Sequence, residues 1–344
     1  FPTRRSSDLS LSGGKTWSRV HPAKCDVTDR AAMERAMEGV STVIVCSATR
    51  SRIGGIAEAA LSSGCELIDI HFSPTLWPEA RRYHKKFEEK GLSWITEGGC
   101  HPGLPGALVR WAAEQIEDLE TVRVSAAFSF KNAIGPGSCV EFAREIPEMR
   151  MGTLEEGEWN EMSMTRPKAT KVDFGGERGM RKCYPFHLHE FVQAVKGEGD
   201  IKHASFCIAE GPWLLDQVAM PIAGLLTKKN PKLARLAGNL LRRVANLTSS
   251  KADASQFLLE AKGRQAGKEA SLRLSIGHRD PAWLTSLCVS SCLHQMTHGG
   301  LAKGVHMMAL AVEPRLFISE IVAHGGAHEL TSTGIEPKPT VRLA

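Results

Sequence analysis

Short apolar runs that alternate with amphipathic stretches constrain the fold of this chain more than any other feature. The runs contain β-branched residues and carry few charges, and they cover residues 41–48, 66–70 and 92–96. Such runs are typical of strands that are buried on both faces. The stretches between them, 55–61 and 78–90, have a helical pattern. Gly64 and Gly91 follow these stretches, and a glycine commonly ends a helix.

Strands that alternate with helices in this way predict a parallel sheet of Rossmann type, wound right-handed. The pattern begins near residue 20. Residues 20–26 lead into Thr28, which we expect to cap a helix over 31–37 that ends at Gly39.

The character of the sequence changes after residue 120. A helix over 105–119, with Pro105 in its first turn, is followed by an alternating, half-buried strand over 121–130. Residues 149–181 are polar and rich in glycine, which predicts loops with short strands. Two further patterns are a hairpin of 255–262 with 269–278 and a long helix over 281–298. We therefore expect an α/β protein: an incomplete Rossmann-type sheet in residues 10–120 and a mixed α+β substrate or dimerisation domain in 121–300.

Composition narrows the class of protein. The 344 residues are 42% hydrophobic and 24% charged, which suits two globular domains and excludes a disordered chain. A net charge of +5 is too small to indicate a nucleic-acid partner. The nine cysteines form no C-x-x-C pair, so we predict buried thiols in a reducing, cytoplasmic compartment and no metal centre.

Small and polar residues follow the predicted strands. These segments are 25–29, 46–49, 69–71 and 97–100. An open parallel sheet binds its ligand beyond the carboxyl ends of the strands. Small side chains there let a flat cofactor approach the backbone, and a carboxylate accepts hydrogen bonds from it. The residues predicted to contact a cofactor are Asp26, Cys46, Ser47 and Ala48.

These motifs, in this order, resemble the saccharopine dehydrogenase family of NAD(P)-dependent oxidoreductases. The residues that carry the resemblance are Asp26–Asp29, Val43–Cys46, Ile56–Gly64, Leu67–Asp69 and, most specifically, Gly99–Leu104. It spans about residues 20–325. The resemblance implies hydride transfer between NAD or NADP and a small amino-acid-like or carbonyl substrate. It also implies that residues 301–325 return to the Rossmann domain, and that Gly99 and Gly103 line the cofactor site; it leaves a homodimer open.

The chain departs from the family pattern in two places. The family begins with a strand, a G-x-G-x-x-G turn and a helix that hold the pyrophosphate, and no such motif occurs here. Residues 1–9 resemble the translation of a sequencing adapter; the alternative is an ordinary terminal segment. We therefore expect a truncated chain with impaired activity, in which the preference between NAD and NADP cannot be read. The second departure is His101, where the family commonly carries Asp.

Cys100 and His101 are the predicted catalytic residues. They lie in a Gly-rich turn at a strand end, where we expect them to line the nicotinamide and substrate cleft. A histidine that titrates near neutral pH suits a proton donor or acceptor. The alternative is a tight turn that needs its glycines and proline, with His101 merely hydrogen-bonded. Thiolate chemistry at Cys100 is less favoured, because the sequence shows no paired base.

Two other motifs have competing interpretations. His187 and His189 would share one face of a strand, which suits a metal ligand pair or a strand end facing the substrate. Residues 228–247 form a basic amphipathic helix. We expect it to pack on the core with a solvated basic face; the alternative is a non-catalytic or membrane-associated scaffold. No G-x-S-x-G motif supports an α/β hydrolase.

Overall fold

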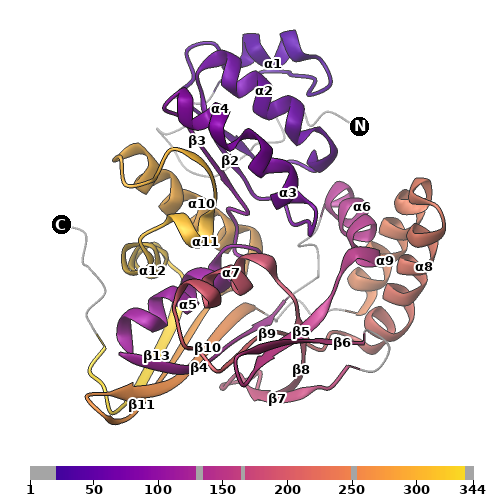
Figure 1. Ribbon diagram of the computed structural model, residues 1–344. Coiled ribbons are helices and arrows are strands. Elements are labelled where there is room, and N and C mark those ends of the chain that lie inside the picture. Colours follow the sequence, from indigo (N-terminus) through magenta and orange to yellow (C-terminus); the bar gives the residue numbers. More distant parts are fainter. Residues whose placement is uncertain (1–20, 129–134, 164–166, 249–253, 338–344) are drawn as a thin grey trace.

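The computed structural model describes residues 21–128, 135–163, 167–248 and 254–337. They form two sheets with helices packed around and between them (Figure 1). Residues 1–20, which include the adapter-like segment, lie outside the described residues, as does the end of the strand expected over 121–130.

The first sheet, sheet A, has four parallel strands in the order β1-β2-β3-β12. Their bounds are Thr42–Val45 (β1), Glu66–Asp69 (β2), Ser93–Thr96 (β3) and Gly304–Met307 (β12). The first three confirm the runs read from the sequence. The fourth comes from the far end of the chain and pairs with β3.

Helices connect the strands of sheet A. They are α1 (Arg30–Met37), η3 (Arg50–Arg52), α2 (Ile53–Ser63), α3 (Leu76–Ala80), η4 (Arg81–Tyr83) and α4 (His84–Glu89). Two expectations were wrong in detail. Asp29, not Thr28, caps α1, because the Asp29 carboxylate accepts from the Ala32 amide. The single helix expected over 78–90 is divided by the 3-10 turn η4, at which Tyr83 packs edge-on against Trp94.

The prediction that the run 41–48 is buried on both faces was also wrong. Ile44 is 38% exposed. Among the described residues β1 is the outermost strand of sheet A, and residues 21–26 contain no strand. Within the described residues β1 therefore has a paired strand along one edge only, which leaves its side chains more exposed than those of a central strand.

The second sheet, sheet C, is mixed. Its main path is β13-β11-β10-β4-β9-β5-β6, and β8 joins β7 to β9. The strands are β4 (Asp118–Ala127), β5 (Met151–Glu155), β6 (Glu158–Met162), β7 (Thr170–Asp173), β8 (Met180–Phe186), β9 (His203–Ala209), β10 (Ser255–Gln265), β11 (Lys268–His278) and β13 (Ala327–Thr333). The predicted hairpin is confirmed as β10–β11, with a tighter turn at Ala266 and Gly267, both at positive φ.

The remaining helices surround sheet C or join the two sheets. They are α5 (Leu104–Gln115), α6 (Pro136–Glu145), η5 (Ile146–Glu148), α7 (His189–Gly197), η6 (Leu215–Ala219), α8 (Met220–Lys229), η7 (Pro231–Leu233), α9 (Ala234–Thr248), α10 (Pro281–Thr297), α11 (Met308–Ala311) and α12 (Pro314–Ala323). Helix α5 ends at Gln115 rather than Leu119, because Leu119 already belongs to β4. The helix expected over 228–247 is broken at Asn230 and Pro231.

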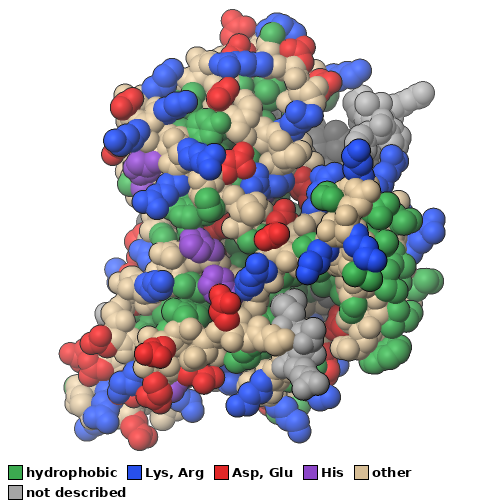
Figure 2. Space-filling model, turned by 45° about the vertical axis from the view of Figure 1, so that its right-hand side comes forward, with side chains coloured by type: hydrophobic (Ala, Val, Ile, Leu, Met, Phe, Trp, Pro, Cys, Tyr) green, Lys and Arg blue, Asp and Glu red, His purple; other side chains and the backbone are tan. Residues whose placement is uncertain are grey.

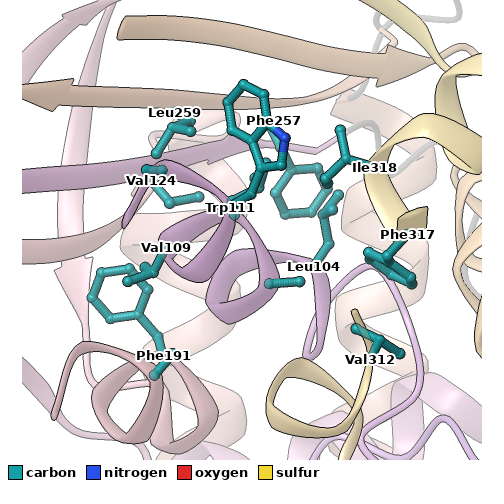
Figure 3. Close-up of a cluster of buried hydrophobic side chains, with 14 of the residues drawn as sticks. Leu104, Val109, Trp111, Val124, Phe191, Phe257, Leu259, Val312, Phe317 and Ile318 are labelled. Atoms are coloured by element: carbon teal, nitrogen blue, oxygen red, sulfur yellow. The ribbon is translucent and has the colours of Figure 1, made fainter. Parts of the chain in front are cut away.

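Helix α5 runs through the centre of the main core (Figure 3). Its Leu104, Val109 and Trp111 are almost completely buried. They pack between side chains of sheet C, such as Phe257, and side chains of α12, such as Phe317. The same cluster includes Ile68 and Ile95 of sheet A. The two sheets therefore share one hydrophobic core, and α5 holds the Gly-rich segment before it between them.

Among the described residues, no helix combines the length and the apolar character that crossing a membrane requires.

Candidate functional site

The loops after β1 and β2 are tied together by His71. Its Nε2 lies 3.1 Å from the carbonyl oxygen of Ser47, and its Nδ1 lies 3.1 Å from Oδ1 of Asp69. Asp69 is fully buried at the end of β2 and also accepts a hydrogen bond from Trp94 Nε1 at 2.7 Å. The backbone that would line a cofactor is thereby held in place from the core side.

The two partners of His71 determine its charge. A carbonyl and a carboxylate can only accept hydrogen bonds, so both ring nitrogens must carry a hydrogen for both contacts to form. Burial opposes the charged ring, but the hydrogen bond and the charge of Asp69 outweigh it, and the pKa of His71 is raised. The surroundings of the ring therefore favour the protonated form, paired with Asp69.

The Gly-rich segment after β3 forms a tight turn that only glycine permits at one position. Gly103 has φ +122°, and a Cβ there would lie 2.5 Å from the Gly99 carbonyl oxygen and 2.6 Å from that of Glu97. Gly99 donates its amide hydrogen to the Pro102 carbonyl at 3.1 Å, and Leu104 donates to Gly99 at 3.2 Å. The turn thus leads directly into the first turn of α5.

His101 lies in an aromatic pocket at this turn. Its ring stacks on Phe128 at 5.3 Å between centroids and contacts Phe72 and Phe206 at 5.3 and 5.2 Å. Burial lowers the pKa of His101 to about 4. The ring is therefore neutral at pH 7, whereas the sequence interpretation assumed titration near neutrality. Its buried Nδ1 has no hydrogen-bond partner among the described residues.

Cys100 is held in a different environment. Its sulfur is buried and lies 3.2 Å from the Thr285 hydroxyl of α10. Burial raises the pKa of the Cys100 thiol to about 11. A thiol with this pKa is almost entirely protonated at pH 7, which argues against nucleophilic chemistry there.

Two carboxyl groups are buried beneath the same turn. Glu97, at φ +58°, precedes the turn, and burial together with the charge of Asp69 raises its pKa to about 8. Glu190, the second residue of α7, receives a hydrogen bond from the Gly103 amide at 3.2 Å. Burial and then the nearby Glu97 raise the pKa of Glu190 well above its usual value. Glu190 therefore anchors the turn from the second half of the chain.

Helix α6, which follows β4 in the chain, lies against the strand-end loops of sheet A. The Arg50 amide donates to Oε1 of Glu141 at 2.8 Å, and the Ser73 hydroxyl donates to Oε2 of Glu145 at 2.9 Å. Nearby, Gly137 approaches Ala48 so closely that an added Cβ would lie 2.9 Å from the Ala48 Cβ. One side of the strand-end region is therefore bounded by α6.

The residues predicted to contact a cofactor lie at this edge of sheet A. Cys46, Ser47 and Ala48 are exposed directly after β1. Asp26 is exposed in the loop before α1, where it accepts hydrogen bonds from the Thr28 amide and hydroxyl. Small, exposed residues after a strand suit an adenosine or a nicotinamide ring. No G-x-G-x-x-G turn occurs in the sequence to hold a pyrophosphate.

The structure of residues 187–190 differs from the strand that the sequence predicted there. His187 follows β8 and His189 begins α7, so they do not share one face of a strand. The described residues contain no group of three or more metal-ligand side chains. The residue that contacts the Gly-rich turn is Glu190, which the sequence analysis did not single out although it follows His189. Its only signal in the sequence was a carboxylate directly before the apolar pair Phe191 and Val192.

His71 and Glu97 were also missed as contributors to the site. Both lie in segments that the strand-end pattern had marked, but nothing local indicated that they would be buried.

A cavity of about 510 Å³ lies beside Arg50 and Tyr83, lined also by Pro74, Thr75, Pro78, Glu79 and Arg82. None of the predicted catalytic residues lines it.

Comparison with known proteins shows which fold the chain shares. Apo saccharopine dehydrogenase (L-Glu forming) from Saccharomyces cerevisiae superposes with a TM-score of 0.62 at 10% sequence identity, covering 90% of this chain and 88% of that one. The chain shares the saccharopine dehydrogenase fold. No protein-family model and no curated protein sequence matches it.

Two further solved structures are similar at a lower level. An engineered D-amino acid dehydrogenase bound to NADP⁺ has a TM-score of 0.42 at 13% identity and covers 88% of each chain. DAP dehydrogenase of C. glutamicum in complex with DAP has a TM-score of 0.39 at 14% identity, covering 86% of this chain and 84% of that one.

Proposed function

We propose that this protein is an NAD(P)-dependent oxidoreductase of the saccharopine dehydrogenase type, which transfers hydride between the nicotinamide and a small amino-acid-like or carbonyl substrate. The observation that carries the proposal is the junction of the Gly99–Gly103 turn with the loops after β1 and β2 at the carboxyl edge of a parallel sheet. This is where open α/β sheets bind dinucleotides. The shared fold supports it.

In this proposal the exposed residues Asp26, Cys46, Ser47 and Ala48 contact the cofactor. Gly99 and Gly103, which were predicted as cofactor contacts, are buried in the turn and shape the edge of the site instead. NAD or NADP, when bound, supplies the hydride acceptor or donor. The protein's own part is to orient it: His71 fixes the Ser47 backbone, and Glu190 fixes Gly103.

We assign His101 a polar contact with the substrate, made by a neutral ring in a largely apolar pocket. Cys100 then supports the turn through Thr285. If His101 contacts substrate, His101→Asn should lower kcat/KM while leaving the shape of the pH profile between about 6 and 8 unchanged, since a group with a pKa near 4 does not titrate there. A new pH dependence in that range would contradict the assignment.

Cofactor binding provides the direct test. We would titrate the folded chain with NADH and with NADPH and follow nicotinamide fluorescence. We expect weak binding, because the chain has no G-x-G-x-x-G turn. Ser47→Asp should weaken binding by roughly tenfold or more, since it places a negative charge beside an anionic cofactor. Ser290→Asp, on the exposed face of α10, is the matched control.

A folded chain that binds neither NADH nor NADPH would contradict the proposal. Equal loss in both serine variants would contradict the location of the site. Once binding is seen, nicotinamide absorbance with saccharopine, other amino acids and small ketones identifies the substrate class.

The compartment and assembly state belong to this proposal too. All nine cysteines are free, which supports a reducing, cytoplasmic compartment. A homodimer stays a prediction.

A further inference from the structure

Large apolar side chains are exposed to solvent over one surface of the molecule. It covers residues 213–248, which contain η6, α8, η7 and α9, and is called here the 213–248 hairpin. Of the twelve large hydrophobic side chains exposed in the described residues, half lie in this hairpin: Trp213, Leu214, Ile222, Leu225, Leu236 and Leu247. Figure 2 shows hydrophobic side chains gathered over α8 and α9, with Lys and Arg at the border.

The exposed side chains follow from helical geometry. In α9, Ala237, Leu241 and Ala245 face the core cluster shared with α6 and α8. Leu236 and Leu247 are three turns apart on the opposite side, and they are 59% and 82% exposed. We expected this helix to pack its leucines on the core. That is correct for Leu241 but wrong for Leu236 and Leu247.

The second helix contributes a similar stripe. Leu214, Ile222 and Leu225 are separated by eight and three residues, which places them along one side of the continuous helical run through η6 and α8. They are between 40% and 56% exposed. Trp213, 71% exposed, lies at the start of this stripe. Both helices of the hairpin thus present apolar side chains to solvent.

Positive charge borders this apolar surface. The hairpin contains Asp216 as its one acidic residue and six basic residues: Lys228, Lys229, Lys232, Arg235, Arg242 and Arg243. Its net charge of +5 equals that of the whole chain, so the other residues balance one another. Asp216 is occupied by the Gly211 amide at 2.6 Å. Throughout the described residues, the six basic side chains form no ion pair.

This combination fits one kind of occupant. A second copy of the same face would place two +5 surfaces together, which is repulsive. Leucine and isoleucine beside unpaired Lys and Arg, with a Trp at the margin, form the pattern by which helices lie in a bilayer interface. The apolar side chains enter the region just below the headgroups, and the cations contact lipid phosphates.

We propose that the 213–248 hairpin docks this protein peripherally on an anionic lipid bilayer, without crossing it. The surface lies outside the strand-end region, so lipid binding and cofactor binding are separate properties. The readout below needs no nucleotide, and its failure leaves the oxidoreductase proposal intact.

The test is co-sedimentation of the full chain with vesicles. One set contains phosphatidylcholine alone, and the other contains three parts phosphatidylcholine to one part phosphatidylserine. We expect binding to the mixed vesicles and a marked loss in high salt. Lys228→Glu with Lys232→Glu should lower the partition coefficient at least about tenfold. Leu236→Gln with Leu247→Gln should lower it as well, without changing net charge.

A matched control separates local charge from net charge. Lys262→Glu with Lys268→Glu, exposed on the β10–β11 hairpin, makes the same change in net charge elsewhere, and it should retain binding. Melting temperatures close to that of the wild type show that all variants fold. No binding to the mixed vesicles, or equal loss in the control pair, would overturn the proposal. A second result would also overturn it. In that case light scattering would show a dimer, and Leu236→Gln with Leu247→Gln would convert the dimer to a monomer without lowering lipid binding.

Discussion

At the scale of single residues, the charge on His71 is a source of stability that depends on pH. Its raised pKa means that the imidazolium contacts with Asp69 and Ser47 stabilise the fold fully below the ordinary histidine pKa of 6.5. That contribution is lost as pH rises through the raised value. His71→Gln should therefore cost about 2 kcal/mol near pH 6 and less near pH 9. Denaturant unfolding at both pH values checks this, and a cost that grows with pH would contradict it.

The buried carboxyl of Glu97 gives a second prediction, in which stability again falls as pH rises, here because burial raises the pKa of an acid. Its pKa is about 4.5 in an unfolded chain and about 8 in the fold, so the protonated carboxyl favours folding below pH 4.5. This advantage is lost as pH rises towards 8, at up to about 1.4 kcal/mol per pH unit. Glu97→Gln should therefore become more stable than the wild type as pH rises from about 5 to about 8.

Thermal melts across this pH range measure the Glu97 effect. Glu89→Gln, on the exposed end of α4, is the control and should follow the wild type. Parallel curves for Glu97→Gln and the wild type would show that the buried carboxyl does not titrate as described.

At the scale of elements, the packing of α7 against α5 requires a glycine. A Cβ on Gly106 would lie 2.0 Å from Oε2 of Glu190 and 2.9 Å from the Cβ of Ala309. Gly106→Ala should therefore destabilise the protein by about 2 kcal/mol. Gly55→Ala in α2 meets nothing within 4 Å and should stabilise it by up to about 1 kcal/mol. Urea unfolding of the two variants provides the comparison; equal shifts would contradict the close contact.

At the scale of the whole molecule, one core joins the two sheets. Ile68 and Ile95 of sheet A belong to the same buried cluster as Val124 and Phe257 of sheet C. We therefore expect one cooperative unfolding transition, with circular dichroism and tryptophan fluorescence coinciding. Phe257→Ala should lower the stability of that single transition by about 4 kcal/mol. Two separated transitions, with only the later part of the structure weakened by the substitution, would show that the sheets unfold independently.

The sequence by itself determined the first three strands of sheet A, the β10–β11 hairpin, α10 and the Gly-rich turn. These features depend on local pattern: short β-branched runs, alternation, and glycines where φ must be positive. It also predicted that the site lies in the strand-end segments. It was wrong where a neighbour decides the outcome, as at Ile44 on the outermost described strand and at the solvent-facing leucines of α9.

Only the tertiary structure decided the electrostatics of the site. Nothing near His101 in sequence reveals Phe72, Phe128 and Phe206 around its ring, which burial makes neutral at pH 7. Likewise, Glu190 is separated from Gly103 by 87 residues, yet it receives the amide hydrogen bond of the turn. A pKa depends on what surrounds a group in space. Local sequence determines conformation, whereas distant segments brought together by folding determine charge.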